Sequence, residues 1–320
     1  MRIIFMGTPE FAVPSLDRLV EHGYPPTAVV TAPDRARGRG REVSPTPVKK
    51  AALRHGIQPL WQPESVKEQN FVADVRGHEP DLIVVVAFRI LPADVFDAAH
   101  LGAFNLHGSL LPKYRGAAPI NHAIMQGETV TGVTTFFLRE KVDTGSIILQ
   151  KEMPIGPNET AGEVHDRMME IAAGAVLETV QLIENGRAQA HVQNDAIATT
   201  APKIYREDCE IRWDRPAQIV HNQIRGLSPY PGAWTMNQDT QLKIYRTLVA
   251  DESRVPSDPA TLAPDIVHAS GTAIVTDGRL FVTCQKSLVE VLELQQEGKK
   301  RLLAREFLRG YPLSIGAVLG

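Results

Sequence analysis

The chain has 320 residues, of which 43% are hydrophobic and 22% charged, proportions typical of a globular protein. This length predicts two domains, and it excludes a disordered chain, a collagen or a small disulfide-dependent scaffold. The formal net charge is −3 at pH 7, so the chain could bind nucleic acid only through a local basic patch.

The sequence predicts a cytoplasmic protein with no membrane partner. Cys209 and Cys284 form no paired motif, which favours a reducing compartment. The most prominent apolar run, from Leu82 to Phe88, has seven residues, against about 20 for a membrane span. The apolar residues that follow Arg2 are too few for a signal peptide.

The first half of the chain alternates short apolar runs with helical patterns, which predicts an α/β fold with a parallel, doubly wound sheet. A first buried strand ends at Gly7, and a helix follows that ends near Glu21. The run from Leu82 to Ala87 is typical of a strand covered on both faces. Further strands are expected at 28–31, 103–107, 133–138 and 147–150.

A long helix is expected at residues 160–185. Thr160 and Glu163 have the spacing of a capping box, apolar residues follow at helical period, and Gly186 ends the pattern. The next residues are polar and rich in alanine. We therefore expect a first domain at 1–190, a linker at 191–205 and a second domain at 206–320.

The second domain is predicted to be a small β-barrel, because short strand patterns are separated by Pro, Gly and Asp turns. One helix is expected near residues 216–225. The expected strands are 210–213, 242–250, 272–276, 280–283 and 287–294.

Three kinds of site are disfavoured by the motifs. The turn at Gly7 has one glycine, whereas a dinucleotide site needs G-x-G-x-x-G. The triplet that starts at Asp143 is the only Asp-Thr-Gly, and an aspartic protease needs two carboxylates that share a proton. The ten histidines are scattered without H-E-x-x-H, and the cysteines lack C-x-x-C spacing, so no metal is expected.

Asn105 and His107 form the most informative pair. Strand residues two apart share a face, and ligands of open α/β sheets bind at the carboxyl ends of the strands. An amide beside an imidazole suits a carbonyl that becomes an oxyanion while a proton moves. Two polar residues that merely cap a strand end are the commoner outcome for this spacing. The loop after Gly108 is either a fixed surface for a flat ligand or a simple turn.

A basic loop follows the second expected strand. Residues 34–50 contain six basic and two acidic residues, a net charge of +4 on a chain of net charge −3. Such a loop can bind phosphates, or it can be a solvated surface. Four of the basic residues alternate with small ones: Arg35, Arg37, Arg39 and Arg41.

Together these segments resemble the methionyl-tRNA formyltransferase family of the folate-dependent formyltransferase superfamily. The similarity is nearly continuous from residue 1 to about residue 245. It is carried by residues 5–14, 34–49, 105–120, 142–145, 160–166, 201–204 and 227–233.

The resemblance implies a Rossmann-like formyltransferase domain and a C-terminal barrel similar to an oligonucleotide-binding fold. It implies an enzyme that needs no metal and transfers the formyl group of 10-formyltetrahydrofolate to the α-amino group of initiator methionyl-tRNA. We also expect a monomer. In this family's pattern Asn105 donates to the oxyanion, His107 stabilises that charge and helps to move a proton, and Asp143 orients His107. The folate site would be bounded by Ser109, Leu110, Leu111 and Pro112. The basic loop would contact tRNA through Arg35, Arg37, Arg39 and Arg41.

The chain departs from the family pattern at three places. Residues 87–91 read Ala-Phe-Arg-Ile-Leu where the family commonly has Ala-Tyr-Gly-x-Ile-Leu, in a segment that borders the pterin pocket. Gly108 stands where Ala is frequent, and Lys141 where Gly is frequent. Two alternatives stay open: a folate-dependent formyltransferase acting on a sugar-nucleotide amine or glycinamide ribonucleotide, and a catalytically silent tRNA-binding protein.

Overall fold

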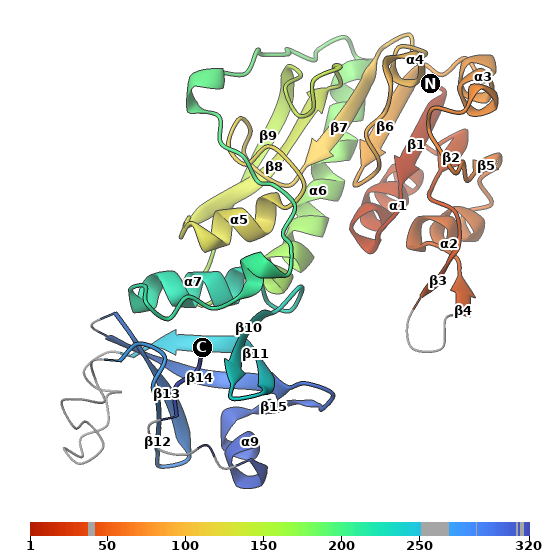
Figure 1. Ribbon diagram of the computed structural model, residues 1–320. Coiled ribbons are helices and arrows are strands. Elements are labelled where there is room, and N and C mark those ends of the chain that lie inside the picture. Colours follow the sequence, from red (N-terminus) through yellow and green to blue (C-terminus); the bar gives the residue numbers. More distant parts are fainter. Residues whose placement is uncertain (38–41, 251–268, 286, 312, 314–316) are drawn as a thin grey trace. The chain divides into compact units, whose positions relative to one another are not determined.

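The computed structural model describes residues 1–37, 42–250, 269–285, 287–311, 313 and 317–320 (Figure 1). The chain forms two compact units. The first comprises Met1–Pro119, Thr131–Met153 and His165–Pro202. The second comprises Ile120–Val130, Pro154–Val164 and Lys203–Gly320. Residues 191–202, most of the segment expected to be a linker, therefore lie in the first unit.

The first unit is built on a seven-stranded sheet in the order β5-β2-β1-β6-β7-β8-β9. The strands from β5 to β7 are parallel, as expected, whereas β8 runs antiparallel to β7. Apolar periodicity indicates that a strand is buried and does not give its direction. The strands are β1 (Ile3–Gly7), β2 (Ala28–Val30), β5 (Leu60–Trp61), β6 (Leu82–Val86), β7 (Ala103–His107), β8 (Val130–Phe137) and β9 (Ile147–Pro154).

Every residue of β1 and of β6 is buried, which explains their continuous apolar sequence. One face of the sheet, which includes Ile4 and Ile83, packs on Phe71 and Val95 of two helices in a single core cluster. The helices between the strands are α1 (Val13–Glu21), α2 (Pro47–Arg54), α3 (Gln69–Gly77) and α4 (Ala93–Phe96).

The long helix α6 (Ala161–Glu184) confirms the expected helix at 160–185. Its capping box is formed as the spacing predicts. The backbone nitrogen of Thr160 donates to Glu163 Oε2 at 2.9 Å, and that of Glu163 donates to Thr160 Oγ1 at 3.3 Å.

The basic loop begins as a two-stranded antiparallel ribbon. Strand β3 (Arg35–Arg37) pairs with β4 (Glu42–Ser44), so that Arg35 lies opposite Ser44. Arg39 and Arg41, which the sequence assigns to tRNA contact, lie outside the described residues.

The second unit contains an antiparallel sheet in the order β10-β11-β14-β13-β12, and β15 pairs with β14. The expected strand at 210–213 is wrong, because only Glu210 forms a bridge, to Trp234. The sequence also misses α5, β10, β15 and α9. The elements are α5 (Pro119–Met125), α7 (Ala217–Gly226), β10 (Ala233–Asn237), β11 (Thr240–Val249), β12 (Ala273–Thr276), β13 (Arg279–Cys284), β14 (Ser287–Gln296), β15 (Arg301–Leu303) and α9 (Ala304–Gly310).

Residues 317–320 close this sheet into the predicted barrel. The backbone nitrogen of Gly320 donates to Met236 of β10 at 3.0 Å. The carbonyl of Ala317 accepts from Ala273 of β12 at 2.8 Å. The two edges of the sheet are thus paired with one short segment. The fold class predicted from the sequence, an α/β domain followed by a small barrel, is confirmed. Throughout the described ranges, each helix is too short or too polar to cross a membrane.

Candidate active site

Strand β7 places Asn105 and His107 on one face at its carboxyl end. Its neighbours are β6, where Val85 pairs with Asn105, and β8, where Thr134 pairs with His107. Asn105 is half-buried, and among the described residues no protein group forms a hydrogen bond with its side-chain amide. The amide N–H groups are therefore available to a bound ligand.

The ring of His107 is buried and fixed at one nitrogen. Its Nε2 lies 2.8 Å from the carbonyl oxygen of Tyr114. A carbonyl only accepts, so Nε2 carries a hydrogen and Nδ1 is the unprotonated nitrogen of the neutral ring. This Nδ1 lies 3.8 Å from Oδ2 of Asp143, which is also buried. That distance exceeds a hydrogen bond, and catalytic contacts commonly tighten when substrate binds.

The carboxylate of Asp143 is held by the backbone. The N–H of Gly116 donates to Asp143 Oδ2 at 2.9 Å. Gly145 follows in the same tight turn, and a Cβ atom there would lie 1.5 Å from the carbonyl oxygen of Phe137. The glycine of the Asp-Thr-Gly triplet is therefore required by close packing. The structure brings His107 and Asp143 together, and Asn105 stands two residues before His107.

Residues 109–112 are anchored to the sheet. Ser109 and Leu111 are buried, and Thr134 joins both, donating to the carbonyl of Ser109 at 2.7 Å and accepting from the nitrogen of Leu111 at 3.0 Å. Leu110 and Pro112 are half-buried. These contacts fix the loop that leads to Tyr114, so Ser109 and Leu111 act as its supports.

Residues 191–201, which no sequence pattern places at this site, lie against these loops. Thr199 accepts through Oγ1 from the nitrogen of Tyr114 at 2.8 Å, and through its carbonyl from Arg115 at 2.9 Å. Further along the segment, Ala201 donates to the carbonyl of Arg115 at 2.7 Å. Its polar, alanine-rich composition indicated only a bridge, because its partners are mostly backbone groups distant in sequence.

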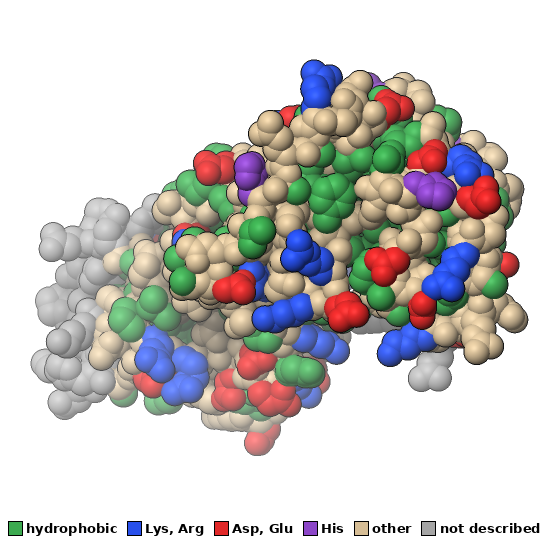
Figure 2. Space-filling view, turned by 90° about the horizontal axis from the view of Figure 1, so that it is seen from above, with side chains coloured by type: hydrophobic (Ala, Val, Ile, Leu, Met, Phe, Trp, Pro, Cys, Tyr) green, Lys and Arg blue, Asp and Glu red, His purple; other side chains and the backbone are tan. Residues whose placement is uncertain are grey.

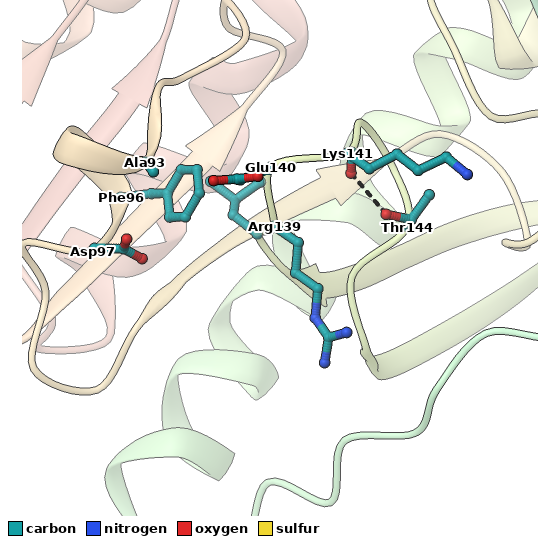
Figure 3. A pocket seen from close by; sticks show the side chains of 8 residues that line it. Ala93, Phe96, Asp97, Arg139, Glu140, Lys141 and Thr144 are labelled. Carbon is teal, nitrogen blue, oxygen red and sulfur yellow. Dashed lines mark hydrogen bonds between the residues drawn. The ribbon is translucent and has the colours of Figure 1, made fainter.

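A pocket of about 520 Å³ lies next to the turn that carries Asp143 (Figure 3). One wall comes from α4 and the other from the residues that follow β8. Thr144 donates to the carbonyl of Lys141 at 2.8 Å and so shapes the second wall. The lining residues are Ala93, Phe96, Asp97, Leu138, Arg139, Glu140, Lys141 and Thr144.

The shortened segment 87–91 lies at the carboxyl end of β6. Ala87 adopts a positive φ of 48°. Arg89 donates to the carbonyl of Glu64 at 2.7 Å, and its guanidinium lies 5.8 Å from the centre of the Phe88 ring. The shortened segment thus carries a cation at Arg89.

Some charges of the basic loop, residues 34–50, are paired with other side chains of the protein. Arg35 is exposed and lies 4.0 Å from the carboxylate of Glu64. Lys49 is paired with Asp34 at 2.5 Å, and this hydrogen bond, with another from Gln62, lowers the pKa of Asp34. On the face shown in Figure 2, basic and acidic side chains lie interspersed. Contacts to a polyanion would therefore be local.

Neither a group of metal ligands nor an exposed thiol is found among the described residues. Within the described ranges, no three His, Cys, Asp or Glu side chains come together to hold a metal ion. Both cysteines are buried and free, and burial raises the pKa of Cys284 to about 12. A thiol in that state is a poor nucleophile.

Asn105, His107 and Asp143 are together called the polar group at the end of β7. With the doubly wound sheet, this polar group is typical of an α/β enzyme that transfers acyl-type groups. Residues 1–180 match the model of the formyl transferase family, and residues 203–312 match that of the formyl transferase C-terminal domain. The chain is 46% identical to the methionyl-tRNA formyltransferase of Moorella thermoacetica, over 100% of this chain and 99% of that protein. It is 49% identical to that of Chlorobium luteolum, over 97% of each chain. The chain belongs to the formyl transferase family and, within it, to the methionyl-tRNA formyltransferases.

Solved structures of similar fold agree with this assignment of the architecture. An N-formyltransferase from Helicobacter canadensis, solved with folinic acid and dTDP-3-aminofucose, aligns with a TM-score of 0.65 at 19% identity. The alignment covers 91% of this chain and 98% of that one. HypX from Aquifex aeolicus, in complex with tetrahydrofolic acid, aligns with a TM-score of 0.64 at 17% identity, over 98% of this chain and 48% of that one. The resemblance seen in the sequence motifs is confirmed.

Proposed function

We propose that this enzyme transfers the formyl group of 10-formyltetrahydrofolate to the α-amino group of initiator methionyl-tRNA. The product, N-formylmethionyl-tRNA, serves translation initiation. The observation that carries the proposal is the full-length similarity to methionyl-tRNA formyltransferases, which includes both units of the chain. The polar group at the end of β7 supplies the chemistry.

Asn105 is proposed to stabilise the oxyanion. The amine nitrogen of the methionyl group attacks the formyl carbon, and negative charge develops on the formyl oxygen. A preorganised amide donor aimed at such an oxygen lowers the barrier, typically by about 3–4 kcal/mol. The amide of Asn105, which has no protein partner among the residues that the structure describes, suits this role at the carboxyl end of β7.

His107 and Asp143 are proposed to manage the proton. Formation of the new C–N bond releases a proton from the amine, and the folate nitrogen takes up a proton as its own C–N bond breaks. His107 can accept the proton of the amine at Nδ1, because its Nε2 already donates to the carbonyl of Tyr114. The carboxylate of Asp143, 3.8 Å away, stabilises the resulting imidazolium.

The folate is proposed to place its ring in the pocket beside α4 and to extend toward the loop that contains Leu110 and Pro112. Phe96 and Leu138 offer apolar walls for a flat ring, and the pocket adjoins the turn of Asp143. Lys141, in place of the family's frequent glycine, adds a cation to the rim. This placement keeps the formyl carbon within reach of the polar group.

The tRNA is proposed to contact the barrel of the second unit and the basic loop. Barrels of this kind offer one face to oligonucleotides. The basic loop would contribute Arg35, Arg37, Arg39 and Arg41 to phosphate contacts. We further propose a monomer acting in the cytoplasm, where charged tRNA is used. Light scattering of the purified chain tests the monomer.

Formyl transfer to three acceptors tests the function. With 10-formyltetrahydrofolate present, the enzyme should formylate charged initiator tRNA. It should transfer to free methionine or to a sugar-nucleotide amine at rates lower by orders of magnitude. Preference for the sugar-nucleotide amine would favour the related sugar formyltransferases. No transfer to any acceptor, with tRNA binding retained, would favour a catalytically silent tRNA-binding protein.

A further inference from the structure

Gln193 lies at the centre of the contacts between residues 191–201 and the active-site loops. The side chain is buried, with 8% of the residue exposed. Its Nε2 donates to the carbonyl oxygens of Asp143 at 2.9 Å and Gly145 at 2.8 Å. Its Oε1 accepts from Nε of Arg115 at 3.1 Å and from Nη2 at 2.7 Å. All the hydrogen-bonding positions of a glutamine amide are thereby used.

These contacts close a ring around the carboxylate of Asp143. Gln193 holds the main chain of Asp143 on one side and the side chain of Arg115 on the other. Next to Arg115, the N–H of Gly116 donates to Asp143 Oδ2 at 2.9 Å. One amide therefore links the two loops whose separation sets the position of this carboxylate.

The same ring reaches His107. Tyr114, on the other side of Arg115, accepts from His107 Nε2 at 2.8 Å. A shift of Arg115 would therefore move the acceptor that orients the imidazole as well as the donor that orients the carboxylate. Both catalytic side chains depend on one anchored loop.

The main chain of Asp143 needs such support. Its φ is +54°, a conformation that residues other than glycine rarely adopt. Strained backbone of this kind persists only when its surroundings hold it. The hydrogen bonds from Gln193 to the carbonyls of Asp143 and Gly145 supply that hold.

We infer that Gln193 is a positioning residue for formyl transfer. It sets the distance between Asp143 and His107 by tying the turn of Asp143 to Arg115. The inference rests on the proposed function, and it assigns to Gln193 alone, within residues 191–201, the positioning of Asp143.

Replacement of Gln193 by an isosteric residue tests the inference. In Gln193→Glu the carboxylate still accepts from Arg115 but offers no N–H to the two carbonyls. We expect kcat to fall about 10–100-fold, because misplacement of about 1 Å has such effects. The KM values for folate and methionyl-tRNA should stay within about threefold of wild type. The pH profile of kcat should be displaced, which a loss of folded protein alone would not cause.

Two further variants serve as partner and control. Gln193→Met keeps the length of the side chain without its polar atoms, and we expect it to lower kcat by a similar factor. It replaces Gln193→Glu as the test if that variant does not fold. Val192→Ala changes the neighbouring residue, which is 81% exposed, and should leave all parameters unchanged.

A double-mutant cycle separates this role from a general loss of stability. If Gln193 acts through Asp143, then Gln193→Glu should lower kcat less than about threefold in an Asp143→Asn background. Equal losses in both backgrounds, or wild-type kcat in Gln193→Glu, would overturn the inference. Failure of the wild-type enzyme to formylate methionyl-tRNA would instead reject the proposed function.

Discussion

The imidazole Nε2 of His107 lies 2.8 Å from the carbonyl oxygen of Tyr114, so one ring nitrogen is committed to the protein and the other faces Asp143. The contact of Nε2 with Tyr114 holds the ring in place, and Nδ1 is the nitrogen proposed to take part in proton transfer. A substitution can keep the first and remove the second.

His107→Gln is expected to fold and to lose activity. The glutamine amide can donate to the carbonyl of Tyr114 as Nε2 does, but it offers no basic nitrogen toward Asp143. General acid–base catalysis contributes typically about 10²–10⁴-fold, so kcat should fall within that range. Thermal unfolding checks that the fold is kept, and single-turnover formylation gives the rate. A rate near that of wild type would exclude His107 from proton transfer.

Asn105→Ala is expected to lower kcat by about 10²–10³, the usual effect of removing one oxyanion donor. Because the amide of Asn105 has no protein partner among the described residues, the substitution should leave the free energy of unfolding almost unchanged. Steady-state formylation of methionyl-tRNA and urea unfolding measure the two quantities. Wild-type kcat in the folded variant would reject the assigned role.

Asp143→Asn is expected to lose most activity as well. It keeps an acceptor for the N–H of Gly116 but removes the charge proposed to stabilise the imidazolium of His107. Binding of folate, measured by calorimetry, should persist. Activity equal to that of wild type would show that the carboxylate charge has no part in the reaction.

The basic loop is expected to bind tRNA phosphates through Arg39 and Arg41. Each phosphate contact contributes a slope of about 0.7–0.9 to the dependence of log K on log salt. The double replacement of Arg39 and Arg41 by Ala should weaken tRNA binding and reduce this slope by roughly one to two units, while folate affinity stays unchanged. Affinities measured at several salt concentrations give both numbers. Two coincident lines would show that the arginines are only solvated, and weaker binding with an unchanged slope would indicate base or shape readout.

The pH dependence of stability is expected to report on His221. This buried ring contacts Thr247 Oγ1 at 2.9 Å and the carbonyl of Pro157 at 3.1 Å. Burial, with a smaller effect of Arg225, lowers the pKa of His221 from 6.5. The unfolded chain therefore binds more protons between the lowered pKa and 6.5, and the free energy of unfolding decreases as pH falls through that window. Urea unfolding between about pH 5.5 and 7.5 measures it, and His221→Gln should flatten the curve.

Replacement of Gly132 and of Gly174 by alanine should change the free energy of unfolding in opposite directions. In Gly132→Ala the new Cβ atom would lie 2.1 Å from the carbonyl oxygen of Lys151, which forces the sheet apart. In Gly174→Ala, inside α6, the Cβ atom would meet no atom within 4 Å other than the adjacent backbone of the helix itself. The first change should lower the free energy of unfolding by more than about 2 kcal/mol, and the second should raise it by about 0.5–1 kcal/mol. Unfolding in urea compares them, and equal effects would contradict the packing at Gly132.

The strongest local patterns in the sequence predict the fold well. The β-branched run of β6 and the capping box of α6 each specify an element by themselves. Helix α2 was missed although Thr46, which accepts from the nitrogen of Lys49 at 3.1 Å, and Pro47 are start signals that can be read from the sequence. The strand expected at 210–213 fails because apolar residues there fill the barrel core without pairing along their length.

Some residues of the candidate site can be predicted from the sequence and others cannot. Asn105 and His107 can be read from a strand period, because both stand on one element. The contacts of Gln193 cannot, since they join three loops through backbone carbonyls that no residue pattern marks. Neither can the pairing of Lys49 with Asp34, which removes one cation from the basic loop. Tertiary contacts between polar groups leave little trace in a single sequence.

The closure of the barrel by residues 317–320 has a consequence for biosynthesis. Strands β10 and β12 leave the ribosome long before the short segment that covers their outer edges. Until residues 317–320 have emerged, Met236 of β10 and Ala273 of β12 lack these backbone partners, and unpaired edge groups attract other strands. Such a chain is a natural client for a chaperone near the exit tunnel, and a stop codon shortly before residue 317 would yield a product prone to aggregate although nearly all of the barrel is present.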